Sequence, residues 1–199
     1  MPGFGASESC GTSANFQTRT AFVLEVIEQL SLDTPLIIGH SMGGAVAAMV
    51  AVKAPERIAG IGLIASPGLR RHRGAPPSRA LLFSWLAVFP LTSWALKGSL
   101  IRAYRRAGFP ASLTHQARVA ALRQVSLYDT QEVAEIMKRV RVPTLVAYAS
   151  DDPLVETDIG TELAEVCPEG PRLHFEKGGH NMQKTCCWEI ADALRAWKA

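Results

Sequence analysis

The 199-residue chain has few cysteines, no long apolar run and neither of the common glycine-rich phosphate-binding motifs. Its 4 cysteines form no C-x-x-C pair, which argues against a zinc site and favours free thiols in a reducing compartment. No stretch reaches the roughly 18 apolar residues that a membrane-spanning helix needs. The first residues also lack the basic and apolar regions of a secretory signal. These absences favour a cytoplasmic location.

Acidic residues are scarce in the middle of the chain. From Arg70 to Arg141 there are 13 Lys or Arg residues but only 3 acids, whereas the rest of the chain holds 8 basic and 15 acidic residues. We therefore interpret residues 69–141 as an insert between two parts of one core, 1–68 and 142–199. Its apolar stretches have helical spacing and no strand pattern, so we expect an all-helical lid. The excess of cations indicates either a solvated helical face or a surface that attracts anionic substrates or anionic membrane lipid.

The rest of the chain alternates short apolar runs with stretches of helical spacing. Strands are predicted at 36–39, 58–65, 144–149 and 172–175. Helices are predicted after the capping run 12–15, over 45–52, over 159–167 and near the C-terminus, and the last helix of the insert is predicted to begin at Asp129. This alternation predicts an α/β fold with a mostly parallel sheet.

The segment from Gly39 to Gly43 fits the G-x-S-x-G pattern of a nucleophile elbow, with Ser41 at its centre. A strand precedes it and a helix of small residues follows it, as this turn requires. We expect glycine at positions 39 and 43 because a Cβ at either would collide with the neighbouring strand or helix. A phosphate-binding turn is the alternative, but the segment has neither the Walker lysine nor the G-x-G-x-x-G spacing.

A nucleophilic serine needs an imidazole to take its proton and a carboxylate to orient the imidazole. Asp152 follows the strand at 144–149, and His180 follows the strand at 172–175. Because such loops gather at one edge of a parallel sheet, these side chains are expected to meet Ser41. Asp151 is the alternative acid. Of the other histidines, we expect His40 to support the elbow, His174 to be structural, and both His72 and His115 to lie on the lid surface.

Three blocks of the sequence, 39–44, 149–155 and 178–180, together resemble the signatures of the α/β-hydrolase superfamily, in its branch of esterases and related hydrolases. The resemblance implies that Ser41 attacks an acyl substrate, His180 transfers the proton and Asp152 orients His180. The family acid stands three residues after a position held here by Ala149, which selects Asp152. The resemblance also implies that the Met42 N–H binds the oxyanion, that no cofactor or metal takes part, and that the substrate is a small acyl compound rather than a nucleic acid. In the lid, the aromatic side chains either cover an apolar acyl pocket or simply pack: Trp85, Phe89, Trp94 and Tyr104.

The chain departs from the family pattern at its start. The first strands and the His-Gly loop after the third strand are not found, and that loop normally supplies a second N–H to the oxyanion. Loss of one such donor typically costs about 10²–10³ in rate. The strand at 36–39 would also present an open edge. Three interpretations remain: a serine hydrolase; a catalytically impaired, hydrolase-like binding protein or a truncated gene product; and an acyltransferase or perhydrolase with the same three residues.

Overall fold

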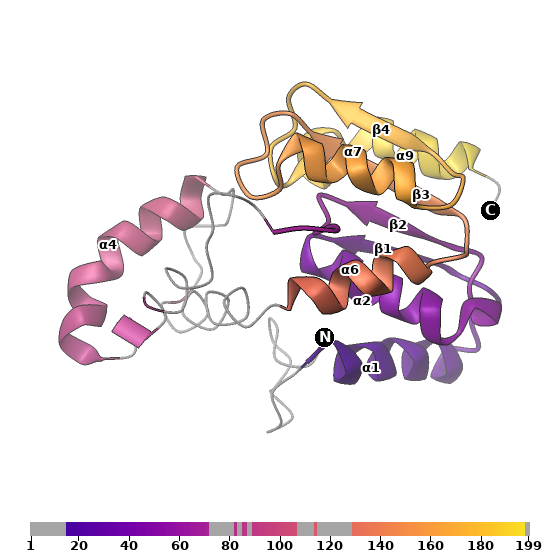
Figure 1. The fold of residues 1–199 in the computed structure, drawn as a ribbon, viewed down its shortest axis with the longest axis horizontal. Coiled ribbons are helices and arrows are strands. Elements are labelled where there is room, and N and C mark those ends of the chain that lie inside the picture. Colours follow the sequence, from indigo (N-terminus) through magenta and orange to yellow (C-terminus); the bar gives the residue numbers. More distant parts are fainter. Residues whose placement is uncertain are drawn as a thin grey trace.

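A four-stranded parallel sheet lies at the centre of the computed structural model, which describes residues 15–71, 82, 85–86, 89–106, 114 and 129–197 (Figure 1). Its strands, in spatial order, are β1 (Leu36–His40), β2 (Gly60–Ile64), β3 (Thr144–Ala149) and β4 (Arg172–Phe175). All three neighbouring pairs are parallel. The α/β fold with a mostly parallel sheet is therefore confirmed, and the predicted bounds of β3 and β4 match the observed ones.

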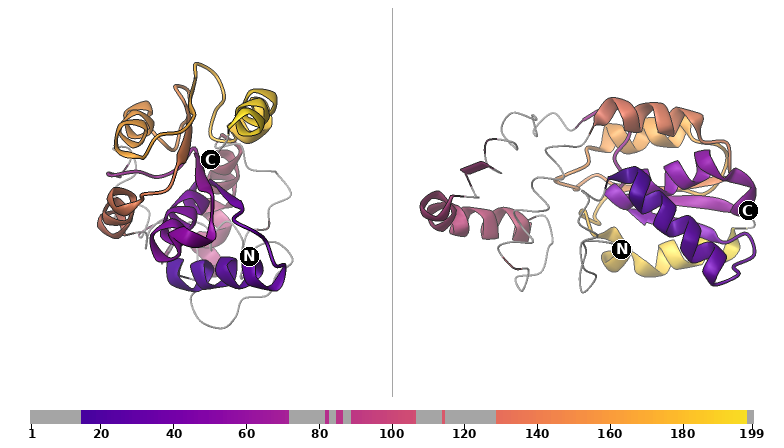
Figure 2. Two further views of the ribbon diagram at one scale, coloured as in Figure 1. Left: turned by 90° about the vertical axis from the view of Figure 1, so that its right-hand side faces the viewer. Right: turned by 90° about the horizontal axis from the view of Figure 1, so that it is seen from below.

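Helices cover both faces of this sheet, as Figure 2 shows. One face packs against α1 (Phe16–Gln29), α2 (Met42–Lys53), α6 (Thr130–Arg139) and α7 (Thr157–Val166), whose apolar side chains form one core cluster with β2. The opposite face packs against α8 (Met182–Thr185) and α9 (Cys187–Ala196). Because helices cover both faces, β2 is buried along its whole length and reads as a continuous apolar run.

Local sequence explains where several helices begin. The Asn15 side chain accepts a hydrogen bond from Thr18 N at 2.9 Å and caps α1. Asp129 likewise accepts bonds from Gln131 N and Glu132 N and caps α6. The small residues of α2 are buried from Gly44 to Ala51, which lets this helix lie close to β1 and β2. The short helices η1 (Pro55–Arg57) and α8 were not predicted.

The predicted insert contains two described helices that differ in their surroundings. Helix α4 (Pro90–Arg106) lies apart from the sheet and its covering helices (Figures 1 and 2). Helix α6 instead packs against α2, with Val133 and Met137 buried in the core. The division into a core and a lid over 69–141 stays a prediction, and the contacts of α6 favour ending the lid before Asp129.

Within the described ranges, no helix is long and apolar enough to cross a membrane, and no group of three His, Cys, Asp or Glu side chains is arranged to hold a metal ion. Cys167, Cys186 and Cys187 are free thiols. Burial raises the pKa of the Cys167 thiol to about 11, so this side chain is not a reactive thiolate near neutral pH. Cys10, His72 and His115 lie outside the described residues.

Candidate active site

Ser41 occupies the single residue between the end of β1 and the start of α2. Its backbone has φ 54° and ψ −128°, a left-handed conformation that is unfavourable for a residue with a side chain. The Ser41 N–H donates to Ile64 O at 2.8 Å, which ties the turn to the end of the neighbouring strand β2. The predicted strand–turn–helix context of Ser41 is therefore present.

The three glycines of this turn differ in how much space a Cβ would have. A Cβ at Gly39 would lie 2.3 Å from Gly43 O, so the expected close approach exists there. At Gly43 the expectation was wrong: a Cβ would meet no described atom within 4 Å. Gly44 also needs glycine, because a Cβ there would lie 2.0 Å from Ser66 Oγ. The reason is the close packing of α2 on Ser66, which lies just after the end of β2.

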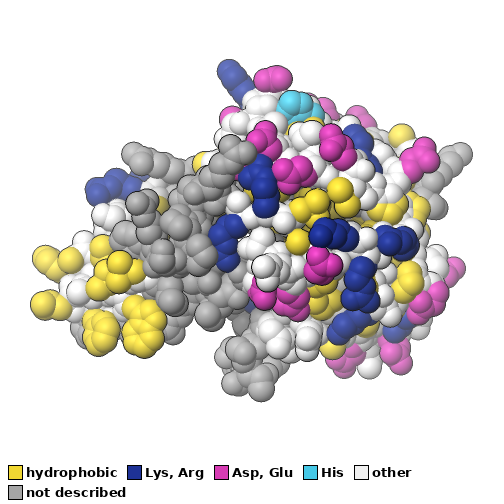
Figure 3. All heavy atoms as spheres, viewed as in Figure 1, with side chains coloured by type: hydrophobic (Ala, Val, Ile, Leu, Met, Phe, Trp, Pro, Cys, Tyr) yellow, Lys and Arg dark blue, Asp and Glu magenta, His cyan; other side chains and the backbone are white. Residues whose placement is uncertain are grey.

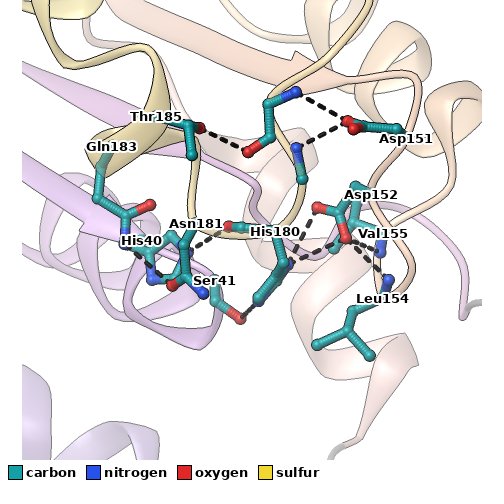
Figure 4. Close-up of polar contacts among 12 residues, drawn as sticks. His40, Ser41, Asp151, Asp152, Leu154, Val155, His180, Asn181, Gln183 and Thr185 are labelled. Atoms are coloured by element: carbon teal, nitrogen blue, oxygen red, sulfur yellow. Dashed lines mark hydrogen bonds and ion pairs between the residues drawn. The ribbon is translucent and has the colours of Figure 1, made fainter. Parts of the chain in front are cut away.

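Ser41, His180 and Asp152 are hydrogen-bonded in series (Figure 4). His180 Nε2 lies 2.9 Å from Ser41 Oγ, and His180 Nδ1 lies 3.1 Å and 3.0 Å from the two carboxylate oxygens of Asp152. A carboxylate can only accept, so Nδ1 carries the proton and Nε2 accepts the Ser41 hydroxyl proton. His180 and Asp152 are both buried, which protects this pair from solvent. The structure therefore brings together the three side chains that the sequence singled out.

The two neighbouring aspartates have different partners. Asp152 Oδ1 also accepts bonds from Leu154 N at 2.8 Å and Val155 N at 3.0 Å, which fix the carboxylate facing His180. Asp151 Oδ1 instead accepts bonds from Gly178 N at 2.8 Å and Gly179 N at 2.7 Å. These backbone N–H groups, Gly179 first, lower the pKa of Asp151. Asp151 therefore fastens the loop that carries His180, while Asp152 contacts the imidazole.

His40 makes a contact that the sequence did not reveal. Its Nε2 lies 2.8 Å from the backbone oxygen of His180, and the centres of the two rings are 5.0 Å apart. Because a carbonyl only accepts, the His40 Nε2–H is the donor. Burial lowers the pKa of His40, which favours the neutral ring beside His180. His40 thus links the elbow to the His180 loop, in addition to its expected place beside Ser41.

The structure also describes His174, Met42 and the lid aromatics that the sequence singled out. His174 lies on β4, where its Nε2 is 2.7 Å from Ser150 Oγ and its ring stacks on Tyr148. Met42 is the first residue of α2, where a backbone N–H has no partner within its own helix and the helix dipole favours negative charge. Of the lid aromatics, Trp85, Phe89 and Trp94 are exposed. Their place over an acyl pocket and the source of a second oxyanion donor stay predictions.

Comparison with known proteins gives matches over nearly the whole chain. The family model described as "Alpha/beta hydrolase family" matches residues 1–188. A dihydrolipoyllysine-residue acetyltransferase component of the acetoin cleaving system from Pseudomonas putida is 39% identical over 213 residues, which cover 99% of this chain and 54% of that protein. An (E)-2-((N-methylformamido)methylene)succinate hydrolase from Acinetobacter baylyi is 23% identical over 204 residues, covering 99% of this chain and 77% of that protein.

A solved structure agrees with the architecture described above. An alpha/beta hydrolase fold protein from Burkholderia ambifaria matches with a TM-score of 0.79 at 15% identity, over 97% of this chain and 77% of that one. At this level of identity the match concerns the fold. The chain spans 50–54% of the length of the acetyltransferase components that it resembles.

Proposed function

Because the chain belongs to the alpha/beta hydrolase family, we propose that it is a serine hydrolase that cleaves an ester or other acyl bond of a small-molecule substrate. In this proposal Ser41 is the nucleophile, His180 is the general base and then the general acid, and Asp152 orients His180. No metal or cofactor takes part in these steps. The supporting observation is the pair of hydrogen bonds in series, Ser41 to His180 and His180 to Asp152.

In the first half of the reaction, Ser41 Oγ attacks the acyl carbon while His180 Nε2 takes the hydroxyl proton. The tetrahedral intermediate then collapses, and the proton on His180 passes to the leaving group as its bond to the acyl carbon breaks. The Asp152 carboxylate stabilises the positive charge that forms on His180 during this step. The product of this half is an acyl ester on Ser41.

Water completes the cycle by the same route in reverse. His180 takes a proton from water, the resulting hydroxide attacks the acyl ester, and the proton returns to Ser41 Oγ as the acid leaves. In both halves the negative oxygen is placed next to the Met42 N–H, at the N-terminus of α2. A backbone donor fixed in place there stabilises the oxyanion without reorganising.

A fluorophosphonate probe, which labels activated serines covalently, tests this proposal. We expect the parent chain to be labelled once, and Ser41→Ala and His180→Gln to lose labelling by at least about 10³-fold. Circular dichroism would verify that each variant is folded. An unlabelled but folded parent chain would instead support a hydrolase-like binding protein.

The chain contains its own control for this experiment. Ser150 and His174 form a second Ser–His contact at 2.7 Å, but there His174 stacks on Tyr148 and has no carboxylate partner among the described residues. Ser150→Ala should therefore be labelled at the rate of the parent chain. Loss of labelling in this variant would show that the probe reports a serine other than Ser41.

Acyl transfer is a second candidate function, favoured by the 39% identity to the P. putida acetyltransferase component. The same acyl-Ser41 intermediate would then pass its acyl group to a thiol or alcohol rather than to water. Turnover of p-nitrophenyl acetate with and without added dihydrolipoamide or an alcohol distinguishes the two. Acylated acceptor as the main product would favour transfer, and acetate alone would favour hydrolysis.

A further inference from the structure

Large apolar side chains are exposed together on and just before α4. In Figure 3 they form the cluster of hydrophobic side chains at the end of the molecule where Figure 1 places α4. Leu91 is 85% exposed and Trp94 is 81% exposed. The same short stretch holds three further exposed apolar side chains: Leu82, Trp85 and Phe89. So much exposed apolar surface in one place is unusual for a protein surface and marks a site of interaction.

Leu91 and Trp94 belong to one face of α4, which continues into basic residues. Leu91, Trp94, Arg102 and Arg105 are all exposed and recur at helical spacing along one side of the helix. Lys97, one turn after Trp94, is also exposed. Leu100 is buried on the opposite side. We call this outward side, made of Leu91, Trp94, Lys97, Arg102 and Arg105, the α4 face.

The charge of this region has one sign. The sequence of α4 has 4 basic residues and no acid, and residues 72–128 as a whole contain 8 basic residues and no acid. Among the described residues, Arg102 bonds to Ser99 Oγ, and no ion pair neutralises Lys97, Arg102 or Arg105. The α4 face therefore combines an apolar, aromatic end with an unneutralised cationic end.

We propose that the α4 face docks on an anionic lipid surface, with Leu91 and Trp94 entering the boundary between headgroups and acyl chains and the cations contacting lipid phosphates. Amphipathic helices of this composition lie in the plane of the interface. A second copy of the chain is disfavoured as the partner, because its α4 face would offer further cations and no acid to pair with Lys97, Arg102 and Arg105. A nucleic acid would satisfy the cations but would leave the exposed aliphatic side chains in water.

Sedimentation with sucrose-loaded vesicles tests this docking. We expect the chain to bind vesicles of 30 mol% phosphatidylglycerol in phosphatidylcholine at least about tenfold more tightly than pure phosphatidylcholine. Each cation near an anionic surface strengthens binding by roughly fivefold, so Lys97→Gln/Arg102→Gln/Arg105→Gln should weaken it by about 100-fold. Leu91→Gln/Trp94→Ser should weaken it by at least about tenfold.

Trp188→Ser is the matched control, because Trp188 is an exposed tryptophan on α9, outside the α4 face. It should bind anionic vesicles like the parent chain. Ser41→Ala should also bind like the parent, so that loss of docking and loss of serine reactivity are separate results. Equal binding to neutral and anionic vesicles, or unchanged binding by either α4 variant, would overturn the proposal. So would dimerisation that Leu91→Gln/Trp94→Ser abolishes, or tighter binding to duplex DNA that this variant retains.

Discussion

At the scale of single residues, two neighbouring aspartates position the same imidazole through different contacts. Asp152 contacts the ring of His180. Asp151 instead accepts hydrogen bonds from the backbone N–H groups of the two glycines that precede His180. We therefore expect Asp152→Asn to slow fluorophosphonate labelling of Ser41 by about 10³–10⁴-fold, because the ring loses the partner that fixes its tautomer.

Asp151→Asn is the comparison variant, since an amide oxygen still accepts the two glycine N–H groups. Its labelling rate should stay within about tenfold of the parent rate, because its contact is with backbone rather than with the reacting ring. Labelling rates under pseudo-first-order conditions would measure both effects. The reverse order of the two variants would assign the carboxylate role to Asp151.

Asp151 should also make stability depend on acidity. Backbone N–H groups hold the pKa of Asp151 below its ordinary value of 3.8, so the unfolded chain binds a proton at this residue more readily than the folded chain. The stabilisation is complete above the ordinary value and is lost as the pH falls through the lowered pKa. In urea unfolding, the advantage of the parent over Asp151→Asn should be constant from about pH 5 to 7 and shrink below about pH 4. A difference that does not change with pH would contradict this.

The residues found from sequence share one property, because each lies in the segment that follows a strand. Asp152 follows β3, whose bounds are clear because this strand is buried as a continuous apolar run. Ser41 and His180 follow β1 and β4, which are only partly buried. The contacts of His40 and Asp151 could not be predicted. Both side chains bind backbone groups of residues far along the chain. Every residue has such backbone groups, so the sequence does not indicate which of them a side chain will contact. The catalytic roles themselves stay predictions until the serine is tested.

At the scale of elements, the contact between α2 and β2 explains why the turn was only partly predictable. The motif singles out Gly39 and Gly43, whereas the steric requirements lie at Gly39 and at Gly44, where α2 meets Ser66. Which side of a helix lies against the sheet depends on the crossing of two elements, which sequence spacing alone does not give. The end of the predicted insert was hard to place for the same reason, because α6 continues the basic region in sequence but packs with the core.

Two alanine variants should therefore change the free energy of unfolding in opposite directions. Gly44→Ala places a Cβ against Ser66 and should lower the free energy of unfolding by about 1–3 kcal/mol. Gly43→Ala meets open space in the first turn of α2 and should raise it by up to about 1 kcal/mol, because alanine favours helix over glycine. Chemical denaturation of the two variants would measure this. A loss of similar size at both positions would contradict the assignment of Gly44 as the contact.

At the scale of the whole molecule, β1 stands at one end of the strand order and, within the described ranges, pairs with β2 alone. Ile38, at its middle, is 41% exposed. An apolar edge strand is a template for pairing with other chains. The predicted open edge thus has a structural counterpart in the described part of the chain.

Ile38→Thr should slow aggregation at 37 °C by at least about twofold, since threonine keeps the strand preference but makes the edge polar. Light scattering over time would measure this. Leu30→Thr is the control, because Leu30 is 65% exposed but lies at the end of α1 rather than on a sheet edge. Equal slowing by both variants would attribute aggregation to general surface hydrophobicity.

The left-handed backbone of Ser41 has a consequence for the molecule as a whole. Glycine adopts this conformation freely, whereas alanine and serine do so at a cost of about 1–3 kcal/mol. Ser41→Gly should therefore unfold at a higher urea concentration than either Ser41→Ala or the parent chain. If so, the most stable form of this protein is one without the Ser41 hydroxyl, and the turn that carries this hydroxyl lowers the free energy of unfolding of the parent chain.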